Sequence, residues 1–395
     1  MNRKIRVLFL PKWYPHRYDP MPGLFIQRQA ESLTPFCDVA VIYVHPDRDC
    51  PNKNEAEFSE ENEVRVLRVY YKVSGQANSI VGKALGWWKY YRAYLKAIHS
   101  VRQFSPDLIH AHVLTRMGVI AWKVCRKQHI PMVISEHWSR YFPQNNSYRG
   151  WGRRWVTSYI VKKASLVIAV SEPLKTAMQQ CHLNNANFQV IPNVVDSAVF
   201  KPQLTAGKKP IKTFAHISCF EDKSKNISGF LEAIHDLSKS RDDFQCLLVG
   251  EGPDWDSMKA YAGALGIIDT FACFTGMKTG TDIAGIMGDA DFTVVSSHYE
   301  TFGTVVIESL YCGTPVVSTS VGIAPAVITG KNGYLVPPDD KNAMIRALNE
   351  MLDHCRTFDR AAIHAEISNR FDKETIGRQL ADQYKALIPE QSLIQ

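Results

Sequence analysis

Two carboxylates on either side of a glycine turn, in the segment S-S-H-Y-E-T-F-G-T-V-V-I-E at residues 296–308, are the residues best suited to chemistry in this chain. Glu300 follows an apolar run at 291–295 that predicts a strand, and Glu308 lies on the helix predicted to begin after Gly303. Such a turn directs free backbone N–H groups and the positive end of a helix dipole at one point. N–H groups hold phosphate and carboxylates accept hydrogen bonds from hydroxyls, so the segment predicts a site for an anionic, polyhydroxylated ligand. An ordinary strand, loop and helix with two solvated glutamates is the alternative.

Histidines lie at the ends of two predicted strands in the first half of the chain. The segment D-L-I-H-A-H at 107–112 ends one strand, and alternation puts His110 and His112 on the same side if that strand continues. Ser135-Glu136-His137-Trp138 ends the next strand in the same way. Polar groups at successive strand ends are where an acceptor would be oriented. Core or capping histidines are the alternative, and a zinc site that includes His137 lacks a companion acid or cysteine at a persuasive spacing.

Turns after other predicted strands carry residues that suit a phosphate. Gly23 ends a proline-rich turn before a helix, where the absence of a side chain lets backbone N–H groups approach an anion. Lys223 and Lys225 follow the first strand of the second half, and an ammonium there can pair with a diphosphate. A mere helix-starting turn and a solvated basic turn are the alternatives. The sequence Gly250-Glu251-Gly252-Pro253 lacks the third glycine of a dinucleotide fingerprint, which argues against a nicotinamide cofactor.

Two D-x-D patterns are the remaining candidates for metal binding. Asp47 and Asp49 lie in a polar loop, and Asp289 and Asp291 stand just before a predicted strand. These positions favour turn and cap roles, so we assign no metal ligand.

The elements that position these residues alternate between short β-branched runs and helices. The predicted strands cover 5–10, 39–44, 64–70, 108–110, 132–135, 166–170 and 189–191 in the first half, and 212–217, 244–249, 271–274, 292–295, 315–318 and 333–336 in the second. This order predicts an α/β fold with two doubly wound, Rossmann-like domains facing each other across a cleft. We expect domains at 1–200 and 201–371, a Pro, Gly and Lys linker at 196–210, and a C-terminal helix at 372–395 that crosses back to the first domain.

Bulk composition narrows the class of protein. A chain of 395 residues with 45% hydrophobic and 22% charged residues suits two globular domains. Its net charge of +7 suits an anionic ligand or membrane surface, and no nucleic-acid motif accompanies that charge. The first ten residues are too short an apolar run for a signal peptide, and no segment approaches the roughly 20 apolar residues of a spanning helix. Nine scattered cysteines predict reduced thiols and a cytoplasmic protein.

Aromatic and basic residues are interleaved in two segments of the first half. These are G-W-W-K-Y-Y-R at 86–92, and Y-R-G-W-G-R-R-W at 148–155 with a Lys pair at 162–163. Basic helices with Trp and Tyr suit the interface of an anionic membrane. Ordinary amphipathic helices with extended Lys and Arg side chains are the alternative.

Taken together, the motifs resemble the family 4 retaining glycosyltransferases of GT-B architecture, also called glycosyltransferase group 1. The resemblance covers nearly the full chain. It depends most on the two glutamates with seven residues between them, then on Y-C-G-T-P-V-V at 311–317 and N-G-Y-L-V at 332–336. V-S-E at 170–172, V-I-P-N-V-V-D at 190–196 with Phe200, V-G-E-G-P at 249–253 and the Gly23 turn support it.

The resemblance implies a role for each candidate in the second half. Glu308 would bind the ribose of a nucleotide, and Glu300 would bind hydroxyls of the donor sugar. Lys225 would be the phosphate-binding lysine, with Lys223 as its substitute. Backbone groups of four consecutive residues would meet the sugar and diphosphate: Thr301, Phe302, Gly303 and Thr304.

In the first half, Gly23 would lie near the diphosphate, and His112 or His137 would lie by the transferred sugar on the acceptor side. One departure concerns an arginine that the family usually carries a few residues before its lysine. The present chain reads H-I-S-C-F-E at 216–221 instead. Loss of a guanidinium removes a bidentate phosphate contact, so another basic residue must substitute or diphosphate binding weakens.

The resemblance implies a hexosyltransferase that moves a sugar from a nucleoside diphosphate sugar to an acceptor hydroxyl, with retention and without a metal or other cofactor. We expect a sugar or lipid-linked acceptor in cell-envelope polysaccharide or glycolipid synthesis, and peripheral contact with the inner face of an anionic membrane. A nucleotide-sugar epimerase of the same architecture and a non-catalytic nucleotide-sugar-binding subunit are the alternatives.

Overall fold

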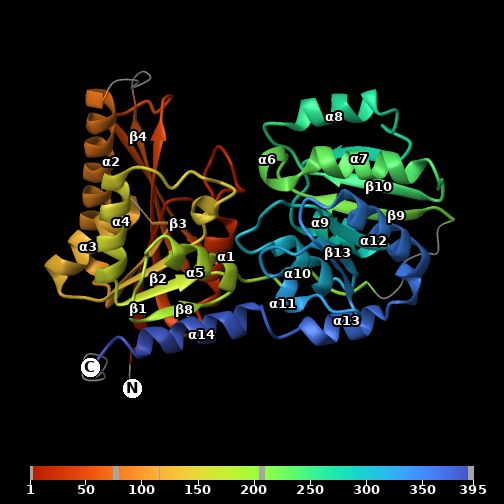
Figure 1. Cartoon of the computed structure of the whole chain (residues 1–395). Helices are drawn as coiled ribbons and strands as arrows, with labels where there is room; N and C mark the ends of the chain where they lie inside the picture. Colours follow the sequence, from red (N-terminus) through yellow and green to blue (C-terminus); the bar gives the residue numbers. More distant parts are fainter. Residues whose placement is uncertain (1–2, 74–79, 115, 204–209, 390–395) are drawn as a thin grey trace.

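Two predominantly parallel sheets, each covered by helices, stand side by side in the computed structural model, which describes residues 3–73, 80–114, 116–203 and 210–389 (Figure 1). The first sheet has the order β3-β4-β2-β1-β5-β6-β7-β8 and the second β11-β10-β9-β12-β13-β14. We call the units built on them the first and the second domain. The α/β class and the pair of Rossmann-like domains predicted from the sequence are confirmed.

The first sheet contains β1 (Ile5–Pro11), β2 (Cys37–Asp47), β3 (Asn54–Glu61), β4 (Val64–Lys72), β5 (Leu108–His112), β6 (Met132–Glu136), β7 (Leu166–Ala169) and β8 (Phe188–Val190). Its helices are α1 (Leu24–Ser32), α2 (Ile80–Ser100), α3 (Arg116–Gln128), α4 (Trp151–Lys163) and α5 (Glu172–Gln180). Apolar, β-branched runs form the central strands because both of their faces are buried under helices. None of the helices in the described ranges is long and apolar enough to cross a membrane.

The second sheet contains β9 (Lys212–Ile217), β10 (Phe244–Val249), β11 (Ala272–Gly276), β12 (Phe292–Val295), β13 (Val316–Thr319) and β14 (Gly333–Val336). Around it lie α6 (Asp222–Lys225), α7 (Ile227–Ser238), α8 (Trp255–Ala264), α9 (Gly280–Asp289), α10 (Thr304–Tyr311), α11 (Ala324–Val327), α12 (Lys341–His354) and α13 (Arg360–Ile367). All its strands pair in parallel, so their carboxyl ends share one edge of the sheet.

Strand β3 was not predicted from the sequence. It pairs antiparallel with β4 at the edge of the first sheet, and its side chains alternate between exposed and half-buried. Its sequence, N-E-A-E-F-S-E-E, is rich in glutamate, which is depleted in strands. Acidic side chains at a sheet edge also oppose pairing with another chain, so they suit this position.

The last helix, α14 (Lys373–Lys385), returns to the first domain and packs against α1. Its buried Ile376, Leu380 and Tyr384 join the same apolar cluster as Ile26 of α1. The contact is close, since a side chain at position 377 would meet the Ser32 carbonyl at 1.9 Å. The chain therefore crosses between the domains twice, and the crossings touch where the Val195 N–H donates to the Phe371 carbonyl at 2.8 Å.

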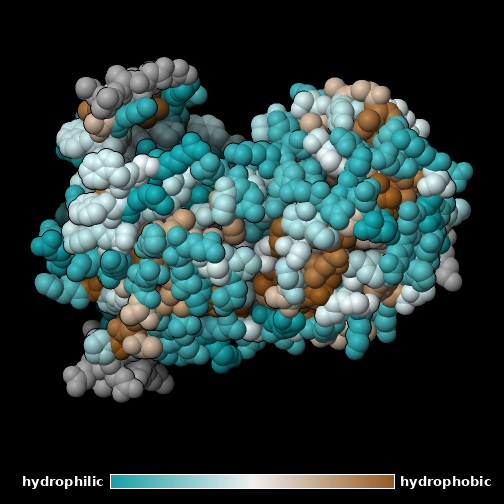
Figure 2. All heavy atoms as spheres, viewed as in Figure 1, coloured by the Kyte–Doolittle hydropathy of each residue, from teal (hydrophilic) through white to brown (hydrophobic). Residues whose placement is uncertain are grey.

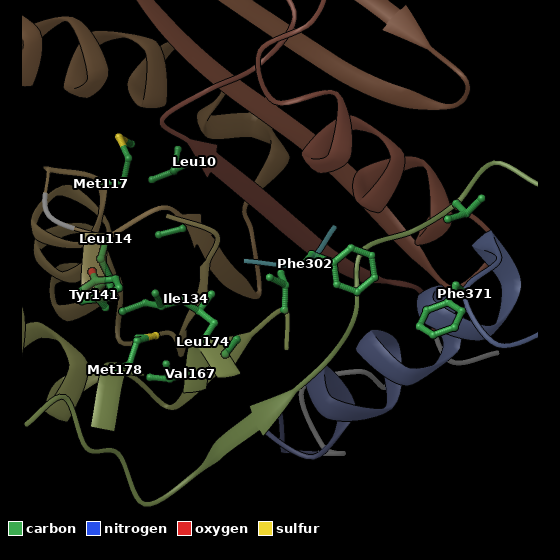
Figure 3. Close-up of a cluster of buried hydrophobic side chains, with 14 of the residues drawn as sticks. Leu10, Leu114, Met117, Ile134, Tyr141, Val167, Leu174, Met178, Phe302 and Phe371 are labelled. Carbon is green, nitrogen blue, oxygen red and sulfur yellow. The ribbon is translucent and has the colours of Figure 1, made fainter. Parts of the chain in front are cut away.

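Apolar packing continues from the first domain into the second. Figure 3 shows Phe302 and Phe371 near the buried side chains that line the first sheet. Their ring centroids are 6.2 Å apart, and both side chains are almost fully buried. The Ser171 hydroxyl of the first domain donates to the Thr301 carbonyl at 2.5 Å, which holds the loop before α10 against the first domain.

Candidate active site

The loop between β12 and α10 carries the glutamate pair, as the sequence predicts. Gly303 caps α10 with a φ of +85°, a left-handed conformation that glycine adopts without strain. Val306, Ile307 and Leu310 bury one side of the short helix. This packing fixes the direction in which the N-terminus of α10 points.

A cavity of about 230 Å³ lies directly beside this loop and is lined by residues of both domains. The first domain contributes Phe25, His137 and Asn193. The second contributes residues at the carboxyl ends of β9 and β12, and the segment at 300–305. A larger groove of about 750 Å³ lies elsewhere, between α2 and α3, and contains none of the predicted site residues.

Glu300 and Lys225 form an ion pair in this cavity. Lys225 Nζ lies 2.5 Å from Glu300 Oε1, and the Ser297 hydroxyl donates to the same oxygen at 2.8 Å. Burial alone would lower the pKa of Lys225, but the adjacent Glu300 carboxylate outweighs burial and raises that pKa above its ordinary value. The lysine is therefore cationic at neutral pH and lies beside an acceptor of hydroxyl hydrogen bonds.

A hydrogen bond from Ser296 holds the backbone of α6 in place at Lys225. The Ser296 hydroxyl donates to the Lys225 carbonyl at 2.8 Å and is itself 3.0 Å from His216 Nε2. Lys223, two residues earlier, is exposed and does not line the cavity. Of the two predicted phosphate ligands, the structure brings only Lys225 to the other site residues.

His112 and His137 meet behind the cavity wall. His112 Nδ1 and His137 Nε2 are 3.4 Å apart, and both rings are buried. Burial lowers the pKa of His137 to about 3 and the pKa of His112 well below its ordinary value, so both imidazoles are neutral. Of these two histidines only His137 lines the cavity, and its Nδ1 has no hydrogen-bond partner among the described residues.

His110 has a structural role. Its two ring nitrogens lie 2.7 Å from the Tyr384 hydroxyl and 2.7 Å from the Ser135 hydroxyl. Both hydrogen-bonding positions are thus used to join β5 to α14 and β6.

Glu308 points across the domain boundary. Its Oε1 accepts a hydrogen bond from Arg28 Nη1 of α1 at 2.8 Å, and the side chains are 10% and 13% exposed. Burial raises the pKa of Glu308, and the Arg28 guanidinium opposes that rise. Glu308 does not line the 230 Å³ cavity, so the structure separates the two glutamates into neighbouring but different environments.

Gly23 caps α1 with a φ of +74°, and a Cβ there would lie 2.2 Å from the Trp13 carbonyl oxygen. Only glycine fits this turn. Phe25, two residues later, lines the cavity, whereas Gly23 itself does not.

Three polar residues of the site were not singled out from the sequence: Arg28, Ser297 and Asn193. Asn193 lies within the I-P-N motif, and its side-chain oxygen is buried without a partner among the described residues. Where the family's usual arginine is absent, Ser218 and Cys219 line the cavity. No pattern within the sequence marks Arg28, because its partner lies 280 residues away.

One carboxylate of each D-x-D pattern has partners within the fold. Asp47 accepts from the Asp49 N–H at 2.8 Å and pairs with Arg17, and Asp291 accepts from the Thr213 N–H at 2.8 Å. Within residues 3–73, 80–114, 116–203 and 210–389, no group of three His, Cys, Asp or Glu side chains is placed to hold a metal ion.

Family comparisons agree with the fold and with the positions of the motifs. Residues 202–365 match the family described as "Glycosyl transferases group 1", and residues 27–199 match "Glycosyltransferase Family 4". The chain belongs to the family 4 glycosyltransferases. The resemblance read from the motifs is thereby confirmed.

Individual relatives span most of this glycosyltransferase. It is 28% identical over 310 residues to the phosphatidyl-myo-inositol mannosyltransferase of Mycobacterium leprae, a match that covers 76% of this chain and 80% of the relative. Sucrose-phosphate synthase of Thermosynechococcus elongatus has a TM-score of 0.76 at 21% identity and covers 97% of this chain and 99% of its own. Anabaena HepE in complex with UDP-glucose has a TM-score of 0.72 at 20% identity, with coverages of 97% and 100%. The GT-B architecture is thus shown.

Proposed function

We propose that this glycosyltransferase moves a sugar from a nucleoside diphosphate sugar to an acceptor hydroxyl with retention of the anomeric configuration. The observation that carries the proposal is the Lys225–Glu300 ion pair, with Ser297 on the same carboxylate oxygen, in a cavity between two Rossmann-like domains. An ammonium next to a hydroxyl acceptor matches a ligand that carries both phosphate and sugar.

Lys225 would stabilise the leaving diphosphate. As the bond from the sugar to the diphosphate breaks, negative charge develops on the leaving oxygen, and a fixed cation in a buried site stabilises that charge strongly. The N-terminus of α10 after Gly303 adds backbone N–H groups and the positive end of a helix dipole. The family's missing arginine leaves Lys225 with a larger share of this task.

Glu300 would bind donor-sugar hydroxyls once the donor's phosphates draw Lys225 away from it. Glu308 would bind the ribose after exchanging Arg28 for ribose hydroxyls. In each exchange the cation that leaves the carboxylate becomes available to the donor's diphosphate, and hydroxyl groups take its place on the carboxylate.

His137 would orient the reacting sugar or the acceptor hydroxyl from the first domain. Because its imidazole is neutral, it can donate one hydrogen bond and accept another. Its Nδ1 has no partner in the described structure, and Asn193 lines the same wall. We assign no covalent nucleophile.

We further propose that the reaction requires no metal ion, and that the acceptor belongs to cell-envelope polysaccharide or glycolipid synthesis at the inner face of the membrane. The lipid named in the mycobacterial mannosyltransferase supports a lipid-linked acceptor. The exposed aromatic and basic helices of the first domain support work beside a membrane.

Incubation of the purified protein with labelled UDP-, GDP- and ADP-sugars, with and without EDTA, tests the proposal. In the wild type we expect slow transfer of the sugar to water, with release of free nucleotide that EDTA does not affect, and with the free sugar first appearing in the α configuration of an α-linked donor. The Glu300→Gln variant should lose this activity, whereas Glu374→Gln on the exposed face of α14 should keep it. A new sugar isomer would instead indicate an epimerase, and binding without turnover a non-catalytic subunit.

A further inference from the structure

Three neighbouring helices on one side of the first domain carry a concentrated positive charge. Helices α2, α3 and α4 each contain four Lys or Arg residues and no Asp or Glu. The whole chain has a net charge of only +7, so the remainder of the protein is net acidic. Figure 1 shows the three helices together, on the side of the first domain that faces away from the second. We call this surface the basic flank.

The charges of the basic flank are not neutralised within the protein. Among the described residues, none of these twelve cations lies within ion-pair distance of a carboxylate. Elsewhere, cations such as Arg17, Arg68 and Arg241 have at least one carboxylate within 3.0 Å. A set of unpaired, exposed cations attracts an extended anionic surface.

Exposed aromatic side chains lie among these cations. Trp88, Trp151 and Trp155 are 51%, 86% and 65% exposed, and no other tryptophan in the described ranges is exposed to this degree. The Trp155 ring stacks on Tyr159 at 6.0 Å, which in turn meets Trp122 of α3 at 5.5 Å. Over these helices Figure 2 shows mainly hydrophilic and near-white side chains, the colours that charged residues and Trp or Tyr have on this scale.

A groove of about 750 Å³ between α2 and α3 adds an apolar recess to the basic flank. Leu8, Ile98 and Val124 form part of its lining, and Lys123 and Lys127 lie along it. Asp107 also lines the groove, but it is already paired with Arg3 at 2.6 Å. The walls of this groove are thus partly apolar and partly cationic.

We propose that the basic flank docks this protein on an anionic lipid bilayer. Unpaired cations attract acidic headgroups, exposed Trp and Tyr rings fit the boundary between headgroups and acyl chains, and the groove accommodates part of a lipid. Three exposed indoles distinguish this surface from a purely electrostatic site for an acidic protein. The basic flank is the surface that would bring the proposed glycosyltransferase to the membrane. Docking itself does not depend on the proposed function, but the identity of the acceptor does.

Vesicle flotation with the full-length protein tests the docking surface. The wild type should bind phosphatidylglycerol–phosphatidylcholine vesicles at least about tenfold more tightly than pure phosphatidylcholine, and should lose most of that preference at about 0.5 M salt. Arg153→Glu with Arg154→Glu should reduce binding at least about tenfold. Lys259→Glu with Lys331→Glu, two exposed lysines of the second domain, is the charge-matched control and should bind as the wild type does.

The aromatic contribution has its own variant. Trp151→Ala with Trp155→Ala should weaken vesicle binding several-fold, while Phe58→Ala, an exposed aromatic on β3, should not. Quenching of tryptophan fluorescence by brominated lipids should be strong in the wild type and reduced in the Trp151, Trp155 variant. Unchanged circular dichroism and Tm establish that each variant is folded.

Equal binding to neutral and anionic vesicles, or equal binding by the Arg153, Arg154 variant and its control, would overturn the proposal. So would binding to an acidic peptide or RNA without binding to vesicles. Nucleotide release from donor sugars in the absence of lipid separates this outcome from failure of the proposed function. A protein that releases nucleotide but ignores vesicles refutes only the docking surface, and one that binds vesicles but turns over no donor refutes only the proposed function.

Discussion

Cations of the cleft and cations of the basic flank differ in whether the protein supplies their counterion. Lys225 and Arg28 each touch a carboxylate of the second domain, at 2.5 and 2.8 Å. The cations of α2, α3 and α4 touch none among the described residues. A buried charge without a partner is strongly destabilising, whereas an exposed charge is stabilised by water. The cations of the cleft are therefore paired with carboxylates of the protein until a ligand binds. The cations of the basic flank remain available to an anionic surface outside the protein.

The cleft and the basic flank bind an anion in two different ways. In the cleft, a ligand has to exchange existing ion pairs, so shape and hydrogen-bond geometry select it. On the flank, nothing has to be exchanged, so attraction depends mainly on charge density and salt. The first arrangement suits recognition of one small molecule, and the second suits adhesion to any acidic bilayer.

The largest expected effect is the loss of Lys225. Lys225→Ala should lower kcat/KM for the donor by about 10³-fold, because a fixed cation next to the leaving group contributes on that scale. Steady-state kinetics with the preferred donor measure the loss. Lys223→Ala, an exposed lysine two residues away, is the matched control and should retain activity within about twofold. Similar losses in both variants would remove Lys225 from its assigned role.

The next effect concerns the stability of the cleft. Arg28→Met leaves the buried Glu308 carboxylate without its cation, which should lower the free energy of unfolding by about 3 kcal/mol. Urea denaturation measures the change. Arg378→Met breaks the Arg378–Glu374 pair, whose side chains are 60% and 75% exposed, and should change stability by at most about 0.5 kcal/mol.

Adding Glu308→Gln to Arg28→Met removes the unpaired charge and should restore part of the lost stability. A double variant as unstable as the sum of the single variants would show that Arg28 and Glu308 do not interact.

A smaller effect follows from neutral histidines in the cleft. The pKa of His137 is lowered to about 3, whereas an unfolded histidine binds a proton below about pH 6.5. The unfolded state therefore gains protons first as pH falls, and stability drops below about pH 6.5 by up to about 1.4 kcal/mol per pH unit for one group. Between pH 7 and 5 the wild type should lose about 2 kcal/mol more than His137→Gln in urea denaturation. Parallel loss in both proteins would contradict the neutral assignment, and His354→Gln, which alters an exposed histidine, is the control.

The smallest effect is expected on the basic flank. Arg153→Gln with Arg154→Gln removes two exposed cations without carboxylate partners, so the free energy of unfolding should stay within about 0.5 kcal/mol of the wild type. Thermal and urea denaturation measure it. If the free energy of unfolding fell by about 2 kcal/mol or more, these two arginines would stabilise the fold to an extent similar to Arg28. The contrast between the cleft and the basic flank would then be wrong.

The regular elements of both domains could be predicted because their signals are local. Apolar strands and amphipathic helices repeat at fixed periods, and turns such as the one at Gly303 mark their ends. The same periodicity fails for β3, where alternating glutamates at an exposed edge lack the apolar face that identifies a strand. The boundaries proposed for the domains stay predictions, and residues 204–209 and 390–395 of the predicted linker and C-terminal segment lie outside the described structure.

The candidate site was predictable where its residues lie at strand ends. Glu300 and Lys225 follow strands of the second sheet, whose parallel strands bring their carboxyl ends to one edge, so their meeting in one cavity follows from topology. His137 follows a strand of the first sheet, so its place in the same cavity depends on how the two domains face each other. The Arg28–Glu308 pair was not predictable, because it depends on how the two domains are placed. The exposed position of Lys223 depends on a single turn of α6, a detail finer than sequence periodicity resolves.

The hydrogen bond between Val195 and Phe371 has a mechanical consequence. Because the two chain crossings touch at one point of the domain boundary, a relative rotation of the domains would be centred near that point, which we call the pivot. The ion pairs of Lys373 with Glu31 and Asp196, at 3.0 and 2.9 Å, fix the pivot to the first domain. The displacement that a rotation produces grows with distance from its axis, so a small rotation at the pivot would move the far edge of the cleft most. A change in this angle beside α14 would therefore change the width of the cleft.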